Sequence, residues 1–191
     1  MKIFLEADLS QVEGRIVYVR SRDPALIALA LKHPWEFDQH TYNAELIFGE
    51  LSTNKKTRYE QRYLGKKVTH GAQRGLGGEK LSGELLKEGY LYSPQQCDRF
   101  IHRYLDAHPG LQKYFGEVRR TLLRDKQLVN IWGRVWPVKY ERFTEDLYRR
   151  AYSWWPQSEN ADLLNQQGFK PLDRWLRNEK LNAAINVQMH D

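Results

Sequence analysis

The sequence has 191 residues, of which 41% are hydrophobic and 13% aromatic, so it can form a hydrophobic core and is not typical of a disordered chain. No apolar run approaches the roughly 20 residues that a membrane span needs. A single cysteine, Cys97, excludes an internal disulfide, so we expect a soluble protein of a reducing cytoplasm. The net charge of +6 favours a polyanionic partner.

The first predicted element is a short buried strand over residues 2–8, which ends in the carboxylate of Asp8. Ser10 and Glu13 follow with the spacing of a capping box, so we expect a helix to begin near Gln11. Helical periodicity then continues in patches that prolines and glycines divide. The next expected helices cover residues 25–31, 38–48, 59–73 and 79–87, with a loop over residues 51–57.

A longer helical stretch should begin after Ser93, because Ser93-Pro94-Gln95-Gln96 combines a capping signature with a proline at the first helical position. This stretch should run to about Arg124, with an interruption near Pro109. A hairpin is predicted next, with strands over 127–132 and 135–138 around a Gly-Arg turn.

The C-terminal part predicts helices over 141–167 and 170–180 and a final strand over 183–189. Pro156 should kink or divide the first of these helices, because proline cannot donate a helical hydrogen bond. The order of strand, helices, hairpin, helices and strand favours an α+β fold in which the first and last strands lie together.

Basic residues concentrate between residues 55 and 80, where eight Lys or Arg and two Glu give a net charge of +6. Within this segment Arg62, Lys66, His70 and Arg74 recur every four residues and should form one stripe along a helix. The stripe spans about 12 Å from Arg62 to His70, a length that suits a triphosphate with a planar ring packed at one end. A solvated helix face with His70 at the surface would give the same spacing.

Two aspartates, Asp8 and Asp191, end the first and last predicted strands. Adjacent strands would bring both carboxylates to one edge of a sheet, where they could hold Mg²⁺ together with substrate phosphates. Two such ions can activate a hydroxyl and stabilise a leaving pyrophosphate. Aspartate also commonly ends strands for purely structural reasons.

Several motifs, in their order along the chain, resemble those of family A (DNA polymerase I-like) DNA polymerases. Asp8-Leu9-Ser10-Gln11-Val12-Glu13-Gly14-Arg15 resembles motif A, and Arg62-x3-Lys66-x3-His70-Gly71 resembles motif B. Val187-Gln188-Met189-His190-Asp191 resembles the start of motif C. The further matching positions are Asp23-Pro24-Ala25-Leu26, Asp38-Gln39-His40-Thr41, Gly75, Gly133-Arg134, Arg149, Pro156, Gln157, Ala161 and Asp162. The resemblance covers essentially the whole chain, and we interpret it as a phage-like fragment.

The resemblance implies roles for the matched residues. Asp8 and Asp191 would be the catalytic carboxylates that hold two Mg²⁺ ions. Glu13 would act as a steric gate that excludes a 2′-hydroxyl. The remaining residues implied to contact the dNTP are Arg62, Lys66, His70, Gln11 and His40. The residues implied to contact the primer–template, largely without reading its sequence, are Arg74, Arg134, Arg149, Gln157 and His190.

The resemblance also implies an architecture and an activity. Residues 1–20 and 125–191 would form part of a palm subdomain with a small antiparallel sheet, and residues 21–124 a mostly helical fingers subdomain. The fragment would belong to a DNA-directed DNA polymerase that transfers dNTPs to a primer 3′-hydroxyl in DNA replication. Its partners would be a DNA primer–template, dNTP and the missing polymerase segments in a separate chain, with no membrane, in the cytoplasm of a bacterial or phage-infected cell.

Departures from the family pattern keep other interpretations open. Leu9 replaces a tyrosine, His70 a phenylalanine or tyrosine, and Arg74 the tyrosine that abuts the templating base. The chain begins at motif A and stops before the motif C glutamate, so we expect the isolated chain to be incomplete. A non-catalytic DNA-binding remnant, or one part of a split polymerase, is the alternative. A relative of single-subunit RNA polymerases is disfavoured by Glu13, because those enzymes need a small residue there.

Overall fold

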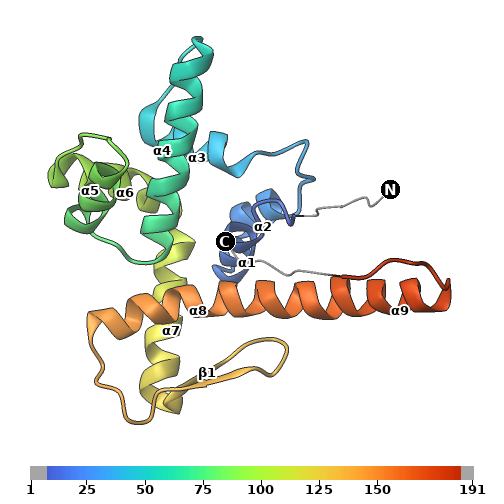
Figure 1. The fold of residues 1–191 in the computed structure, drawn as a ribbon. Coiled ribbons are helices and arrows are strands. Elements are labelled where there is room, and N and C mark those ends of the chain that lie inside the picture. Colours follow the sequence, from blue (N-terminus) through green and yellow to red (C-terminus); the bar gives the residue numbers. More distant parts are fainter. Residues whose placement is uncertain (1–7, 186–191) are drawn as a thin grey trace.

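The computed structural model describes residues 8–185, and this part of the chain is mostly helical (Figure 1). Its helices are α1 (Val12–Arg20), α2 (Pro24–Ala30), α3 (Gln39–Phe48), α4 (Lys55–Gln73), α5 (Gly78–Lys87), α6 (Pro94–Asp106), α7 (Pro109–Asp125), α8 (Glu145–Leu163), the short π-helix η1 (Leu164–Phe169) and α9 (Lys170–Asn178). Strands β1 (Gln127–Val129) and β2 (Val135–Pro137) form an antiparallel hairpin. The predicted α+β fold with a small antiparallel sheet is confirmed.

The helices are arranged around two long axes (Figure 1). Helix α4 forms a column with α5 and α6 beside it, and α7 descends from the foot of this column to the hairpin. Helices α8 and α9 form one long rod that crosses α7, while α1 and α2 lie between this rod and α3. None of the described helices is long and apolar enough to cross a membrane.

Side-chain caps explain where most helices begin. Ser93 and Gln96 form the predicted capping box at the start of α6. Asn54 accepts hydrogen bonds from two backbone N–H groups of the next turn, so α4 begins at Lys55. The loop expected over residues 51–57 is therefore too long by three residues. Thr144 caps α8 in the same way, so this helix begins later than residue 141.

The start of α1 differs from the prediction. Gln11 precedes the helix in a left-handed conformation (φ 57°), and no side chain caps this end. The expected capping box of Ser10 and Glu13 is therefore wrong. The Gln11 side chain instead reaches α3, where it donates to Asp38 at 2.8 Å and accepts from the Gln39 N–H at 2.8 Å. Contacts between distant segments thus decide how this helix begins.

Pro156 does not divide its helix, which continues from Glu145 to Leu163. A proline leaves the carbonyl four residues earlier, here that of Tyr152, without its helical donor. The hydroxyl of Tyr114 on α7 donates to this carbonyl at 2.7 Å, and the Tyr114 side chain is buried. A tertiary contact therefore replaces the missing helical hydrogen bond, and of the two predicted outcomes, a kink or a division, the division is wrong.

The core lies where α1, α3, α4, α6, α7 and α8 meet, and it includes buried polar side chains. The Tyr18 hydroxyl donates to Asn43 at 3.0 Å, and Gln73 donates to the hydroxyl of Tyr104 at 2.8 Å. Helices α3 and α4 approach closely because α4 carries Gly65 at the contact, where an added Cβ would lie 2.7 Å from the Cβ of Ala44. These contacts fix α4 against α3 and α6.

The two outer strands of the prediction are not confirmed by the described residues. Residues 2–7 lie outside the part of the chain that the structure describes, as do residues 186–189. Residues 183–185 are described and form neither helix nor strand. Both hairpin strands are present but shorter than expected, and they pair in the register Leu128 to Trp136.

Candidate functional site

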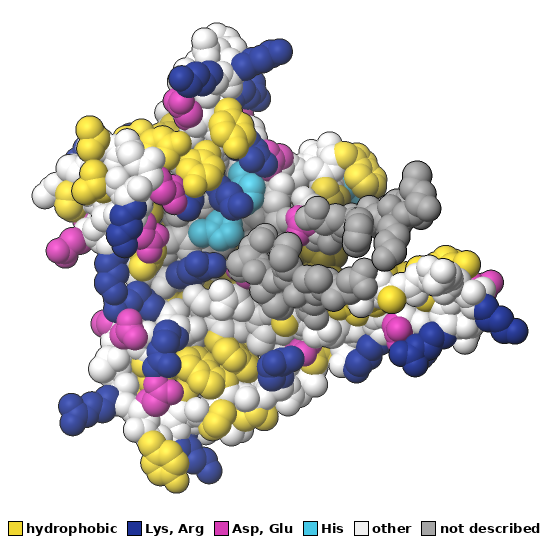
Figure 2. All heavy atoms as spheres, viewed as in Figure 1, with side chains coloured by type: hydrophobic (Ala, Val, Ile, Leu, Met, Phe, Trp, Pro, Cys, Tyr) yellow, Lys and Arg dark blue, Asp and Glu magenta, His cyan; other side chains and the backbone are white. Residues whose placement is uncertain are grey.

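The basic stripe lies on α4, as its spacing predicts. Some of its residues contact other helices, and others are exposed to solvent. Arg62 and His70 point toward the beginning of α3, whereas Lys66 is exposed to solvent. Figure 2 shows histidine side chains near the middle of one face of the molecule, with Lys and Arg side chains on either side of them. The stripe therefore presents charge at the surface while its other members contact neighbouring helices.

Asp38 connects three helices at this site. Its carboxylate receives two hydrogen bonds from Arg62, at 2.6 and 3.0 Å, and one from Gln11 at 2.8 Å. It also caps α3 by accepting from the His40 N–H at 3.2 Å and from the Thr41 hydroxyl at 2.6 Å. Partial burial opposes ionisation, but the hydrogen bonds from Arg62 and Thr41 outweigh it and lower the pKa of Asp38 to about 2.

Two histidines pack beside this carboxylate. The ring centres of His40 and His70 lie 5.8 Å apart, and His40 is only 8% exposed. Burial, followed by the nearby cations, lowers the pKa of His40 to about 4 and that of His70 to about 3. Both rings are therefore neutral at neutral pH, so His70 can offer a planar surface but no positive charge. It is not the ordinary surface residue of the alternative interpretation.

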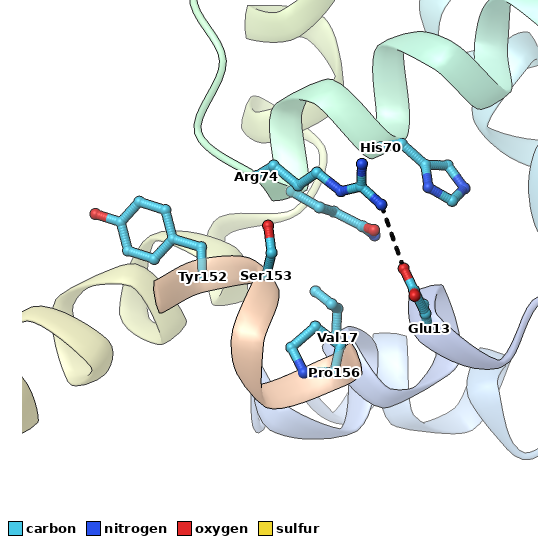
Figure 3. A pocket seen from close by; sticks show the side chains of 8 residues that line it. Glu13, Val17, His70, Arg74, Tyr152, Ser153 and Pro156 are labelled. Atoms are coloured by element: carbon cyan, nitrogen blue, oxygen red, sulfur yellow. Dashed lines mark hydrogen bonds and ion pairs between the residues drawn. The ribbon is translucent and has the colours of Figure 1, made fainter. Parts of the chain in front are cut away.

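Glu13 and Arg74 face one another across a small cavity where α1, α4 and α8 meet (Figure 3). The Arg74 guanidinium lies 3.5 Å from the Glu13 carboxylate. The cavity has a volume of about 10 Å³, room for about one water molecule, so a nucleotide would have to bind outside it. The residues that line it are Glu13, Val17, His70, Gln73, Arg74, Tyr152, Ser153 and Pro156.

Three of the five predicted DNA-contacting residues lie on the hairpin and α8, whereas Arg74 ends α4 and His190 lies outside the described residues. Arg134 of the hairpin forms two hydrogen bonds to Asp162 of α8, at 2.9 and 2.6 Å, so much of its charge is already paired. Arg149 lies 3.2 Å from Asp146, and Gln157 is exposed on α8. Arg149 also lies beside the end of α4, because an added Cβ at Gly75 would be 3.6 Å from its Cγ.

The predicted catalytic carboxylates are only partly within the described structure. Asp8 is described and exposed, whereas Asp191 and the adjoining His190 lie outside the described residues. Within residues 8–185, no group of three or more His, Cys, Asp or Glu side chains is placed to hold a metal ion. The two-carboxylate site remains a prediction, and carboxylate oxygens such as those of Asp8 are the donors that Mg²⁺ prefers.

The structure brings most of the predicted nucleotide-binding residues together at one place, the meeting of α1, α3 and α4. Sequence reasoning did not single out Asp38 as a site residue, although it stands in a matched segment and immediately before an expected helix. An aspartate at that position is a strong candidate for a cap. Its contact with Arg62 could not be read from the sequence, because 24 residues separate them. The predicted nucleotide-binding residues gathered there are Gln11, Glu13, His40, Arg62 and His70. Arg74, which was predicted to contact DNA, lies with them.

Comparison with known proteins places the chain in a family. The family model of DNA polymerase family A matches residues 1–191. The chain is 27% identical to DNA polymerase I of Bacillus caldotenax over 99% of its length, and 24% identical to DNA polymerase I of Pseudomonas aeruginosa over 98%. It spans about a fifth of each of these relatives, 21% and 20% respectively.

A solved structure has the same fold. The POL domain of Pol1 from M. smegmatis, in complex with DNA primer-template and dNTP, superimposes with a TM-score of 0.74 at 22% sequence identity. The match covers 95% of this chain and 31% of that one. With the family model matching from the first residue to the last, the chain belongs to DNA polymerase family A.

Proposed function

We propose that this chain is part of the catalytic centre of a DNA-directed DNA polymerase, in which it binds the incoming dNTP and contacts the primer–template. The observation that carries the proposal is the gathering of Arg62, His70 and Arg74 on one helix of a family A fold, with Glu13 facing them from α1. Phosphoryl transfer depends mainly on positioning and charge stabilisation, which such an arrangement can supply.

The binding roles follow from exposure and charge. Lys66 is exposed and free to approach a triphosphate, while Arg62 would have to share its guanidinium between Asp38 and a phosphate. The neutral ring of His70 would pack against the sugar or base. Gln11 and His40 would support the site through Asp38, to which Gln11 donates directly and whose carboxylate accepts the His40 N–H.

Divalent metal ions are general to family A polymerases, and we propose Mg²⁺ held by Asp8 and Asp191. When bound, two such ions activate the primer 3′-hydroxyl and stabilise the leaving pyrophosphate. Asp8 is exposed just before α1, on which Glu13 lies, so its carboxylate is near the proposed nucleotide site along the chain. The two carboxylates should come within about 8 Å of each other, since metals in such sites lie roughly 4 Å apart.

The division into subdomains, the origin and the location are part of the same proposal. Residues 1–20 and 125–191 would belong to the palm and residues 21–124 to the fingers, in the cytoplasm of a bacterial or phage-infected cell. The polymerase segments that the relatives have beyond this match would come from the rest of a longer protein or from a separate chain. A DNA-binding role without catalysis is the second candidate, which the pairing of Arg62, an expected triphosphate contact, with Asp38 favours.

Primer extension tests the proposal. The purified chain would be incubated with a primer–template, Mg²⁺ and dNTPs, with and without polypeptides that supply the remaining segments of a family A polymerase. We expect weak or no extension by the chain alone and template-directed extension by the completed assembly. Salt-sensitive DNA binding without extension, even in the completed assembly, would instead support the DNA-binding role.

A further inference from the structure

We propose that Arg74 is a positioning residue that holds the carboxylate of Glu13 in place and so sharpens discrimination between deoxyribonucleotides and ribonucleotides. The inference rests on the proposed function, in which Glu13 excludes the 2′-hydroxyl. It concerns a position where an arginine stands in place of the tyrosine expected from the family resemblance. Arg74 would act through Glu13 and would not need to touch the sugar itself.

The backbone at Arg74 is fixed by the way α4 ends. Arg74 is the C-cap, Gly75 follows in the left-handed conformation (φ 70°), and the Leu76 N–H donates to the Gly71 carbonyl at 2.9 Å. With the Gly75 N–H bonded to the Ala72 carbonyl at 3.0 Å, this is a Schellman motif, a well-defined helix end.

Helix α8 packs directly on this helix end. An added Cβ at Gly75 would lie 3.0 Å from the ring of Tyr152, so the turn after Arg74 lies against that ring. Arg74 therefore projects from a supported backbone toward α1, as the dashed line in Figure 3 shows.

The backbone of Glu13 is also held in place by neighbouring contacts. It is the second residue of α1, and the adjacent Gly14 packs against the amide of Gln39, where an added Cβ would lie 2.4 Å away. Gln11 ties the same end of α1 to α3. The backbone of Glu13 is thus held, but its side chain still has several rotatable bonds, and the 3.5 Å contact with Arg74 limits them.

The electrostatics of the cavity favour this pair. Arg74 is the one cationic side chain among the eight residues that line it, because the neighbouring His70 is neutral at neutral pH. Glu13 stands at the N-terminus of one helix and Arg74 at the C-terminus of another, so each charge is also stabilised by its own helix dipole. The Glu13 side chain is 25% exposed and the Arg74 side chain 44% exposed, so added salt should weaken the pair.

The proposal predicts how nucleotide selectivity responds to substitution. The affinities of the purified 191-residue chain for dCTP and CTP would be measured by NMR titration, which also reports whether each variant is folded. Glu13→Ala should remove the preference for dCTP. Arg74→Ala should lower the ratio of the CTP to the dCTP dissociation constant by roughly two- to fivefold, the effect expected of a partly exposed ion pair. The matched control Arg58→Ala removes one exposed charge from the same helix and should leave the ratio unchanged.

Three further measurements separate positioning from bulk charge. The double variant Glu13→Ala/Arg74→Ala should behave as Glu13→Ala does, because Arg74 acts through that carboxylate. Arg74→Lys, which keeps the charge, should recover part of the ratio. Raising the salt concentration should lower the ratio of the wild type toward that of Arg74→Ala.

The outcomes distinguish this inference from the proposed function. If Glu13→Ala removes the preference for dCTP while Arg74→Ala leaves it intact, the positioning role is wrong and the proposed function stands. If the folded wild type binds neither nucleotide, or binds both equally, the proposed nucleotide site is wrong and this inference is overturned with it.

Discussion

At the scale of single residues, Asp38 links α3 to α4 and to the start of α1 through one carboxylate. Its pKa of about 2 lies below the usual 3.8, because hydrogen bonds from Arg62 and Thr41 overcome the effect of partial burial. A carboxylate with a lowered pKa stabilises the fold above its unfolded pKa, and this stabilisation is lost as the pH falls through the folded pKa.

Asp38→Asn tests this contribution. Asparagine also caps helices, so the bond from the His40 N–H should survive while the ion pair with Arg62 is lost. We expect the free energy of unfolding to fall by about 1–2 kcal/mol at pH 6, after allowance for solvent screening. The difference from the wild type should be roughly halved at pH 3, because part of the protonation has then occurred. Urea unfolding at both pH values measures this, and a difference that does not change with pH would contradict it.

His70 changes stability in the same direction as Asp38 when the pH falls, but over a higher pH range. Burial and neighbouring cations lower its pKa to about 3, so the folded chain keeps the ring neutral while the unfolded chain binds a proton below about pH 6.5. Stability is therefore lost as the pH falls from about 6.5 toward 3. His70→Phe removes this group, and the variant should lose about 1–2 kcal/mol less than the wild type between pH 7 and pH 5. Equal losses, measured by urea unfolding, would show that His70 is protonated in the folded chain.

At the scale of elements, the hydrogen bond from α7 to α8 predicts that the stability of α8 depends on a residue outside that helix. Tyr114→Phe removes the donor to the Tyr152 carbonyl and should lower the free energy of unfolding by about 1–3 kcal/mol, because a buried acceptor loses its partner. In a Pro156→Ala background, the restored backbone N–H can serve the same carbonyl, so Tyr114→Phe should then cost much less. Equal costs in both backgrounds, measured by urea unfolding, would show that the hydroxyl does not replace the helical bond.

Helix α4 carries a second prediction at this scale. Lys66→Ala should weaken binding of a dNTP more than Lys67→Ala, because Lys66 lies on the stripe and is exposed. Lys67 points about 100° away, and its ammonium lies 2.5 Å from Glu88. Both substitutions remove one positive charge from the same helix, so each is the other's control. Equal losses of affinity, measured by titration with a dNTP, would mean that only the total charge matters.

The same elements show how far the sequence can predict the fold. Local spacing in the sequence correctly predicted three features: the stripe on α4, the capping box at Ser93 and the hairpin. Ser10 and Pro156 have equally clear local signals, but Ser10 and Glu13 form no capping box and Pro156 does not divide α8. In each case the end or course of the helix depends on a contact with a distant segment: Gln11 bonds to Asp38, and Tyr114 donates to the Tyr152 carbonyl. Patterns within a segment cannot reveal such partners.

At the scale of the whole molecule, some site residues could be predicted from local spacing, whereas their partners could not. Residues on α4 could be named because one helix carries them in a regular repeat. Their ion-pair partners, Asp38 for Arg62 and Glu13 for Arg74, come from other helices, and these contacts depend on packing between distant segments. The family itself was predictable, because it rests on many short motifs in a fixed order and not on any one of them. The phage-like origin and the division into palm and fingers stay predictions.

The most direct test of the account is the rate at which a completed assembly, containing this chain and the remaining segments of a family A polymerase, adds one complementary dNTP. If this chain carries the catalytic centre, Asp8→Asn should lower the single-turnover rate by roughly 10³-fold, equivalent to the several kcal/mol of charge stabilisation that a metal ligand supports. Asp125→Asn, which neutralises an aspartate paired with Arg124 on α7, should leave the rate nearly unchanged. An assembly that extends the primer equally well with Asp8→Asn would contradict the central claim.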